Sequence, residues 1–158
     1  MRRFLFGLWL VYMTPPPFVE AQTVLHFDVP IALDSLELTH KSAIHIDASQ
    51  GVFDDHEAWL AEYKRLHAAL AKHLKAGGLA LHEKQKFYLR IYFQTEGRIG
   101  HLSYQHLEGP MTEKQAQLFE QLMTSFAGQF QLEKRADVPF KQCGSVLIQP
   151  NVELPKSP

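Results

Sequence analysis

The stretch FYLRIYFQTEGRIGHLSYQHL, residues 87–107, decides the fold that the sequence predicts. In residues 87–93, large apolar side chains occupy every second position, a period that is typical of a strand with one buried face. The polar turn that follows contains Gly97, which adopts positive φ without strain, and a second strand begins at Ile99. The stretch therefore predicts a β-hairpin, with Tyr92 on the less buried face.

The first of two predicted amphipathic helices precedes the hairpin. It begins in the segment VFDDHE, residues 52–57, where Asp54 is the expected N-cap, and it ends at Gly77 and Gly78. Apolar residues recur through it at helical spacing, so that one side is expected to face a sheet. This expected stripe consists of Leu60, Tyr63, Leu66, Leu70 and Leu74.

The second helix follows the hairpin. Thr112 and Gln115 have the spacing of a capping box, and Pro110 precedes them. An apolar stripe follows, and it is expected to cover Leu89, Ile91 and Phe93 of the hairpin. The stripe consists of Phe119, Leu122, Met123, Phe126 and Phe130.

The short apolar run QCGSVLIQ, residues 142–149, predicts a last strand between Pro139 and Pro150. The order helix, strand, strand, helix, strand predicts the α+β class, with two helices packed on one face of a small antiparallel sheet. Upstream of this domain, residues 22–51 form a strand-like segment with short strands expected in TVLHFDVP and SAIHID. The domain itself is assigned to residues 52–150, and residues 151–158 are expected to form a loose tail.

Residues 1–21 are predicted to be a signal peptide. Arg2 and Arg3 precede a short apolar run, three prolines interrupt that run, and the sequence VEA ends at Ala21. An uncleaved anchor is the alternative, but a spanning helix needs roughly 20 apolar residues. The expected mature chain is periplasmic or secreted, with no transmembrane segment after cleavage.

Composition excludes several classes of function. The net charge is −1 over 158 residues and no basic run occurs, so nucleic acid is not an expected partner. Ser145 and Cys143 lack a nucleophile motif, and Cys143 is expected to be a small buried residue. We therefore expect a non-enzymatic protein with no cofactor and no metal site.

Two other ligand sites stay open as alternatives. The first is a metal or small-ligand site, or an enzyme site, built from the His- and Asp-rich region between His45 and Glu57, in which His45 and Asp47 would share a strand face. The second is an aromatic and basic surface on the outer face of the hairpin, although cross-strand packing explains its aromatic residues equally well. This surface would contain Tyr88, Arg90 and Tyr92, with Tyr104, which together with Leu102 is expected to face inward, as a further candidate.

From about residue 52 to 150, the chain resembles the C-terminal domain of TonB-type energy transducers, in the short version typical of Bacteroidetes. The resemblance lies in KFYLRIYFQTEGRIGHLSYQHLEG, residues 86–109, and in the helix, polar turn and closing strand of residues 116–150. Phe130 stands where the family usually has Trp, and Pro139 stands where it has a turn proline. The chain departs from the family in having Asp137 at the position of the turn glycine, and it has no long proline-rich spacer.

This resemblance implies a protein-binding module of the cell envelope. The last strand would lie at a sheet edge and accept an extended segment by strand addition. The occupant could be another envelope protein, a second copy of the chain, or the chain's own TVLHFDVP segment, which would close the edge. The predicted partner-binding residues are Gln142, Cys143, Gly144, Ser145, Val146, Leu147 and Ile148.

The signal peptide gives a direct prediction. We expect the protein isolated from its native host to begin at Gln22, because Ala21 and Val19 place small or aliphatic residues before the cleavage point. N-terminal sequencing of the native protein measures this. Recovery of intact Met1 in the membrane fraction would contradict it.

Overall fold

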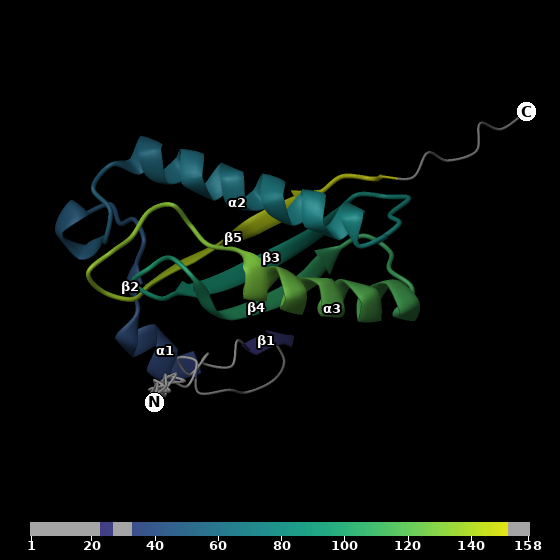
Figure 1. Cartoon of the computed structure of the whole chain (residues 1–158), viewed down its shortest axis with the longest axis horizontal. Coiled ribbons are helices and arrows are strands. Elements are labelled where there is room, and N and C mark those ends of the chain that lie inside the picture. Colours follow the sequence, from purple (N-terminus) through teal and green to yellow (C-terminus); the bar gives the residue numbers. More distant parts are fainter. Residues whose placement is uncertain (1–22, 27–32, 152–158) are drawn as a thin grey trace, which may run out of the picture.

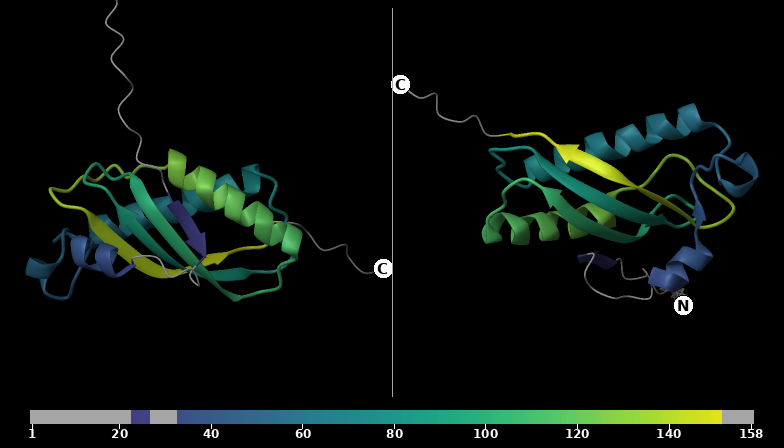
Figure 2. Two further views of the ribbon diagram at one scale, coloured as in Figure 1. Left: turned by 90° about the horizontal axis from the view of Figure 1, so that it is seen from below. Right: turned by 180° about the vertical axis from the view of Figure 1, so that it is seen from behind.

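The computed structural model describes residues 23–26 and 33–151. One sheet carries two long helices on one face, and a short helix lies on the other (Figures 1 and 2). The α+β prediction with two helices on one sheet face is therefore confirmed. In chain order the elements are β1 Thr23–His26, α1 Leu33–Thr39, β2 Lys41–Ser42, the 3-10 helix Ala48–Gln50, α2 His56–Ala76, β3 Gln85–Phe93, β4 Ile99–Glu108, α3 Glu113–Gln129 and β5 Phe140–Ile148.

The sheet has the strand order β1-β4-β3-β5-β2. Its three central strands are antiparallel, as the hairpin predicts, with β3 bonded to β4 on one side and to β5 on the other. The two short outer strands pair in parallel, β1 with β4 and β2 with β5, so the whole sheet is mixed. The N-terminal strand β1 thus lies at the edge opposite to that of β5.

The turn between β3 and β4 depends on Gly97. Its φ is +83°, as predicted, and a Cβ there would lie 2.8 Å from the carbonyl oxygen of Lys134. The Gly97 carbonyl also accepts a hydrogen bond of 3.0 Å from the backbone N–H of Leu132. The hairpin turn is therefore packed against the connection between α3 and β5.

The N-cap of helix α2 lies one residue later in the sequence than expected. The N-cap is Asp55, whose carboxylate accepts a hydrogen bond of 2.8 Å from the N–H of Ala58, so the prediction of Asp54 is wrong. The expected stripe is also wrong at Leu60, which is 50% exposed, while Trp59 is buried. Successive helical residues point about 100° apart, so burial of the larger Trp59 turns Leu60 toward solvent. Leu66, Leu70 and Leu74 are buried as expected.

Helix α3 agrees closely with the sequence prediction. Thr112 and Gln115 form the capping box, each side chain binding the other's backbone N–H. Phe119, Met123 and Phe126 are buried, and Leu122 and Phe130 are partly buried against the same core.

The N-terminal region differs most from the prediction. Of the expected strand SAIHID, residues 42–47, only Ser42 lies in a strand, β2, and Asp47 instead accepts hydrogen bonds from Ser49 and starts a 3-10 helix. Helix α1 was not predicted, and it packs on the sheet face opposite to α2 and α3 (the α1 face), where the Tyr92 hydroxyl donates a 2.7 Å bond to Glu37. Tyr92 is consequently 1% exposed, so its expected lesser burial is wrong.

Some predictions fall on residues outside the described part of the chain. The signal peptide at residues 1–21 lies there, as do residues 27–30 of TVLHFDVP and residues 152–158 of the tail. Asn151, placed in the tail by the sequence, is held by hydrogen bonds to the backbone of Leu79 and Leu81. Within the described ranges, no helix combines the length and apolar character needed to cross a membrane.

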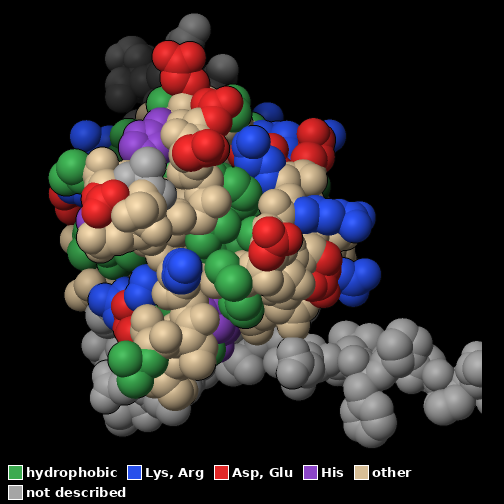
Figure 3. Space-filling view, turned by 90° about the vertical axis from the view of Figure 1, so that its left-hand side faces the viewer, with side chains coloured by type: hydrophobic (Ala, Val, Ile, Leu, Met, Phe, Trp, Pro, Cys, Tyr) green, Lys and Arg blue, Asp and Glu red, His purple; other side chains and the backbone are tan. Residues whose placement is uncertain are grey.

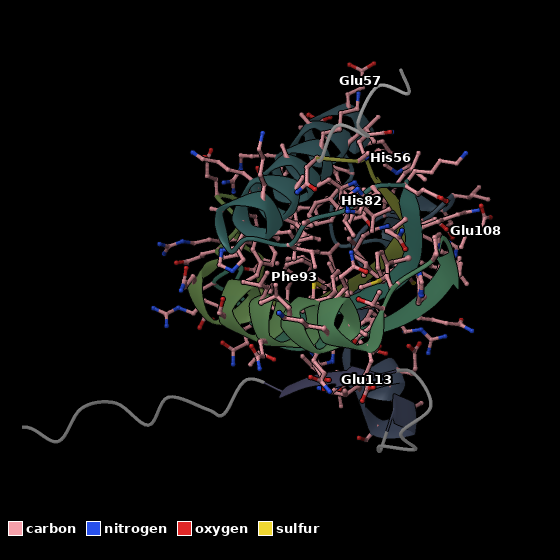
Figure 4. The ribbon with its side chains drawn as sticks, turned by 90° about the vertical axis from the view of Figure 1, so that its right-hand side faces the viewer. His56, Glu57, His82, Phe93, Glu108 and Glu113 are labelled. Atoms are coloured by element: carbon pink, nitrogen blue, oxygen red, sulfur yellow. The ribbon has the colours of Figure 1, made fainter. Side chains whose placement is uncertain are left out.

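The core lies between the sheet and the two long helices. Figure 4 shows Phe93 inside this layer, while Glu57 and Glu113 lie at the periphery. At the α3 end, the Phe119 ring stacks on Phe87 with centroids 4.3 Å apart, and it meets Tyr104 edge-on at 5.1 Å. This aromatic cluster joins α3 to both strands of the hairpin.

Phe119→Ala tests this packing. We expect a loss of about 3–5 kcal/mol in the free energy of unfolding, since a buried phenylalanine is removed and a cavity remains. Leu60→Ala on α2 is the control, because this half-exposed side chain has little burial to lose. Chemical denaturation of the two variants gives the comparison, and equal midpoints would contradict the assignment of the buried faces.

Candidate functional site

The outer edge of β5 is the candidate site. On its inner side β5 pairs with β3 along its whole length, from Phe140 to Ile148. On its outer side β2 pairs only with Phe140 and Lys141. Among the strands that the structure describes, none pairs with residues 142–148 on that side. The sequence-predicted segment therefore lies along a strand edge that the described chain leaves open.

The direction of the backbone groups follows from two hydrogen bonds to β2. The carbonyls of Pro139 and Lys141 accept from the N–H groups of Lys41 at 3.2 Å and Ala43 at 2.8 Å. Because both backbone groups of a strand residue point to the same side and the side alternates, the odd-numbered residues of β5 face outward. The outward set consists of Cys143, Ser145 and Leu147.

Even-numbered residues of β5 have their backbone groups directed to β3. Val146 is therefore a poor choice for probing the edge, since its N–H belongs to the ladder with β3. The seven predicted residues thus divide into two groups. Three offer outward backbone groups, and the other four, Gln142, Gly144, Val146 and Ile148, hold the strand to the sheet.

Gln142 ties the edge to α2. Its side-chain oxygen accepts a 2.9 Å hydrogen bond from Nε1 of Trp59, and its side-chain nitrogen donates at 2.9 Å to the carbonyl of Cys143. One outward carbonyl is thus already engaged, although a carbonyl oxygen has a second lone pair. Sequence analysis missed the part played by Trp59, for which nothing in the local pattern provides a signal.

The outward-facing residues also expose uncharged side chains on the α1 face of the sheet. Leu147 is 48% exposed, and Ser145 and Cys143 are exposed. The prediction that Cys143 is buried is wrong, because odd-numbered positions of β5 point away from α2 and α3. Its neighbour across the ladder on this face is Arg90, and the Tyr88 hydroxyl lies within hydrogen-bonding reach of the thiol.

Gly144 lies next to the side chain of Tyr63. A Cβ at Gly144 would lie 3.0 Å from the hydroxyl oxygen of Tyr63 on α2. That hydroxyl is buried without a hydrogen-bond partner among the described residues, and burial raises the pKa of Tyr63 to about 12. Gly144 therefore lets α2 lie close to the edge strand.

The His- and Asp-rich region does not form the expected strand face. Nδ1 of His45 accepts a 3.1 Å hydrogen bond from the N–H of Asp47, while the Asp47 carboxylate caps the 3-10 helix. Within residues 23–26 and 33–151, no three His, Cys, Asp or Glu side chains are placed to hold a metal ion.

The aromatic and basic surface is only partly assembled. Tyr88, Arg90 and Tyr92 share the α1 face, but Tyr104 lies on the opposite face, where it contacts Phe87 and Phe119. Tyr104 therefore belongs to the core and not to this surface. On the part of the molecular surface shown in Figure 3, acidic and basic side chains are interspersed.

Comparisons with protein-family models, with curated proteins and with solved structures found no match for this chain.

Substitutions at Gly144 and Tyr63 test the contact beneath the edge. Gly144→Ala should lower the free energy of unfolding by about 1 kcal/mol or more, because the new methyl group crowds the Tyr63 hydroxyl. Tyr63→Phe should change stability little or raise it, since it removes an unsatisfied buried hydroxyl. In the Tyr63→Phe background, Gly144→Ala should therefore cost less.

The double-mutant cycle consists of the wild-type protein, the two single variants and the double variant. Denaturant unfolding measures the stability of each. Gly100→Ala is the control, because its Cβ would meet only the flexible side chain of Gln94, at 3.4 Å. If the changes in unfolding free energy caused by the Gly144 and Tyr63 substitutions are strictly additive, the two residues do not interact, and the proposed steric contact is contradicted.

Proposed function

We propose that the chain is an exported, non-enzymatic protein-binding module of the cell envelope, which recognises an extended segment by strand addition to β5. The observation that carries the proposal is the outer edge of β5, which pairs with β2 only at Phe140 and Lys141. Beyond Lys141, the backbone groups of Cys143, Ser145 and Leu147 point outward. Strand addition uses such groups for affinity and neighbouring side chains for selection.

The dimensions of the edge define the segment that fits. Residues 143–148 extend over about 20 Å, enough for a partner segment of about six residues. The segment would begin or end beside Lys141, since β2 already occupies the edge there.

Side chains beside the edge favour an uncharged partner segment. Leu147 is 48% exposed on the α1 face of the sheet. On the other face, Leu60 is 50% exposed and precedes Tyr63, the neighbour of Gly144, by about one helical turn. Apolar partner side chains on either face would find apolar surface, and selection would come from these two leucines.

Residues 23–26 of the TVLHFDVP segment do not lie at this edge, because β1 pairs with β4 at the opposite side of the sheet. The remaining occupants are another envelope protein and a second copy of the chain. Export and location in the envelope rest on residues 1–21 and on the resemblance to TonB-type C-terminal domains. That resemblance also supports strand addition as the mode of binding.

Proline substitution tests edge recognition. Ser145→Pro removes an outward N–H and should leave the fold intact while abolishing capture of the partner from an envelope extract of the native host. Ser145→Ala keeps the N–H and should bind normally. Val146→Pro should instead destabilise the protein, because it removes a hydrogen bond to β3.

Amide hydrogen exchange gives an independent measurement. In the protein alone, the amides of Ser145 and Leu147 should exchange faster than those of Gly144 and Val146, and a bound partner should slow the first pair. Protection that grows with protein concentration alone would identify a second copy as the occupant. A folded Ser145→Pro variant that captures its partner normally would refute edge recognition.

A further inference from the structure

The α1 face of the sheet carries a second cluster, which strand addition does not use. It is centred on Glu37 of α1. The Tyr92 hydroxyl donates a 2.7 Å hydrogen bond to Oε1 of Glu37, and Nη1 of Arg90 lies 3.8 Å from the same oxygen. Nζ of Lys141 forms an ion pair with Oε2 and also donates at 3.2 Å to the Glu37 backbone carbonyl.

These contacts hold Glu37 ionised. Burial alone would raise its pKa, but the hydrogen bonds from Lys141 and Tyr92 and the charges of Lys141 and Arg90 outweigh burial, so the pKa lies below its ordinary value. Three side chains from two adjacent strands thus form a receptor for one carboxylate. The pairing of Tyr92 with Lys141 in the β3–β5 ladder fixes its geometry.

Among the α1 side chains that the structure describes, residues 35–39, little apolar surface is buried. The helix contains only seven residues, Leu38 is 88% exposed, and Leu36 is only partly buried. Besides Glu37, His40 fastens this region, with its ring meeting Tyr92 edge-on at 5.2 Å. Within residues 35–40, the contacts that hold this region on the sheet are therefore mainly those of Glu37 and His40.

Two polar atoms beside the receptor lack partners. Nε2 of His101 and Oγ of Ser103 are buried, in residues that are 8% and 2% exposed, and neither has a hydrogen-bond partner among the described residues. In the β3–β4 ladder, His101 lies opposite Tyr92 and Ser103 lies opposite Arg90. A buried polar atom without a partner costs about 1–3 kcal/mol, so two of them on one face point to a missing polar ligand.

We infer that Arg90, Tyr92 and Lys141 form a binding site for a small hydroxycarboxylate, and that Glu37 occupies this site as a tethered substitute. The ligand's carboxylate replaces that of Glu37, and its hydroxyl group binds Ser103 or His101. A tethered group competes at an effective concentration in roughly the millimolar range, so the free ligand binds weakly until Glu37 is displaced.

Removing the charge of Glu37 tests the inference. The full chain and its Glu37→Gln variant are titrated with lactate, and the ring signals of Tyr92 and His101 are followed by NMR. We expect at least about tenfold tighter lactate binding in the variant, because the competing carboxylate is gone. Glu37→Ala should give the same gain in affinity. This second variant controls for any effect of the glutamine side-chain amide that Glu37→Gln introduces.

Two further substitutions in the Glu37→Gln background locate the site. Lys141→Gln should abolish lactate binding, whereas Lys86→Gln, a lysine paired with Glu108 at the far end of β3, should leave it unchanged. Ser103→Ala should weaken binding of lactate but not of acetate, which lacks the hydroxyl group. No gain in the Glu37 variants, or lactate binding that survives Lys141→Gln, would overturn the proposal.

Discussion

The rest of the fold depends on the close contact between the hairpin turn and the connection that follows α3. Gly97 makes the contact possible, because a side chain there would collide with the Lys134 carbonyl. Hydrogen bonds from Leu132 to Gly97 and from Ala136 to Thr95 then hold the connection across the turn. The same contact determines where β5 enters the sheet, opposite Phe93, and so places β3 at the centre.

A central β3 leaves the sheet with two unequal edges. At one edge, β1 pairs with residues 101–104 of β4. At the other, β2 covers two residues of β5 before the chain turns away at Ala43. The proposed protein-binding edge and the proposed carboxylate site both lie on β5 and meet at Lys141, whose carbonyl binds β2 and whose ammonium group binds Glu37. They use different atoms, so either function can exist without the other.

Features with strong local signals were predicted correctly from the sequence. The alternating hairpin, the turn glycine and the Thr112 capping box each depend on a few adjacent residues. Features decided by distant contacts were missed. Helix α1 is short and gains its place from β3 and β5, and Asp54 and Asp55 are equally good caps until Trp59 is buried. The edge position of residues 142–148 was expected from the family resemblance, but the choice of Ser145 over Val146 as an outward residue required the register against β2.

The polar attachment of α1 also bears on how cooperatively the molecule unfolds. The aromatic and aliphatic layer under α2 and α3 is one continuous cluster, whereas the described contacts of α1 are mainly those of Glu37 and His40, so we expect α1 to detach before this layer is lost. Detachment would bring Tyr92 into contact with water and leave the central ladder intact. The protein then has a partly opened state lying below global unfolding in free energy. Ionic strength would shift its population, since salt screens the attraction between Glu37 and the two cations more than it weakens the core.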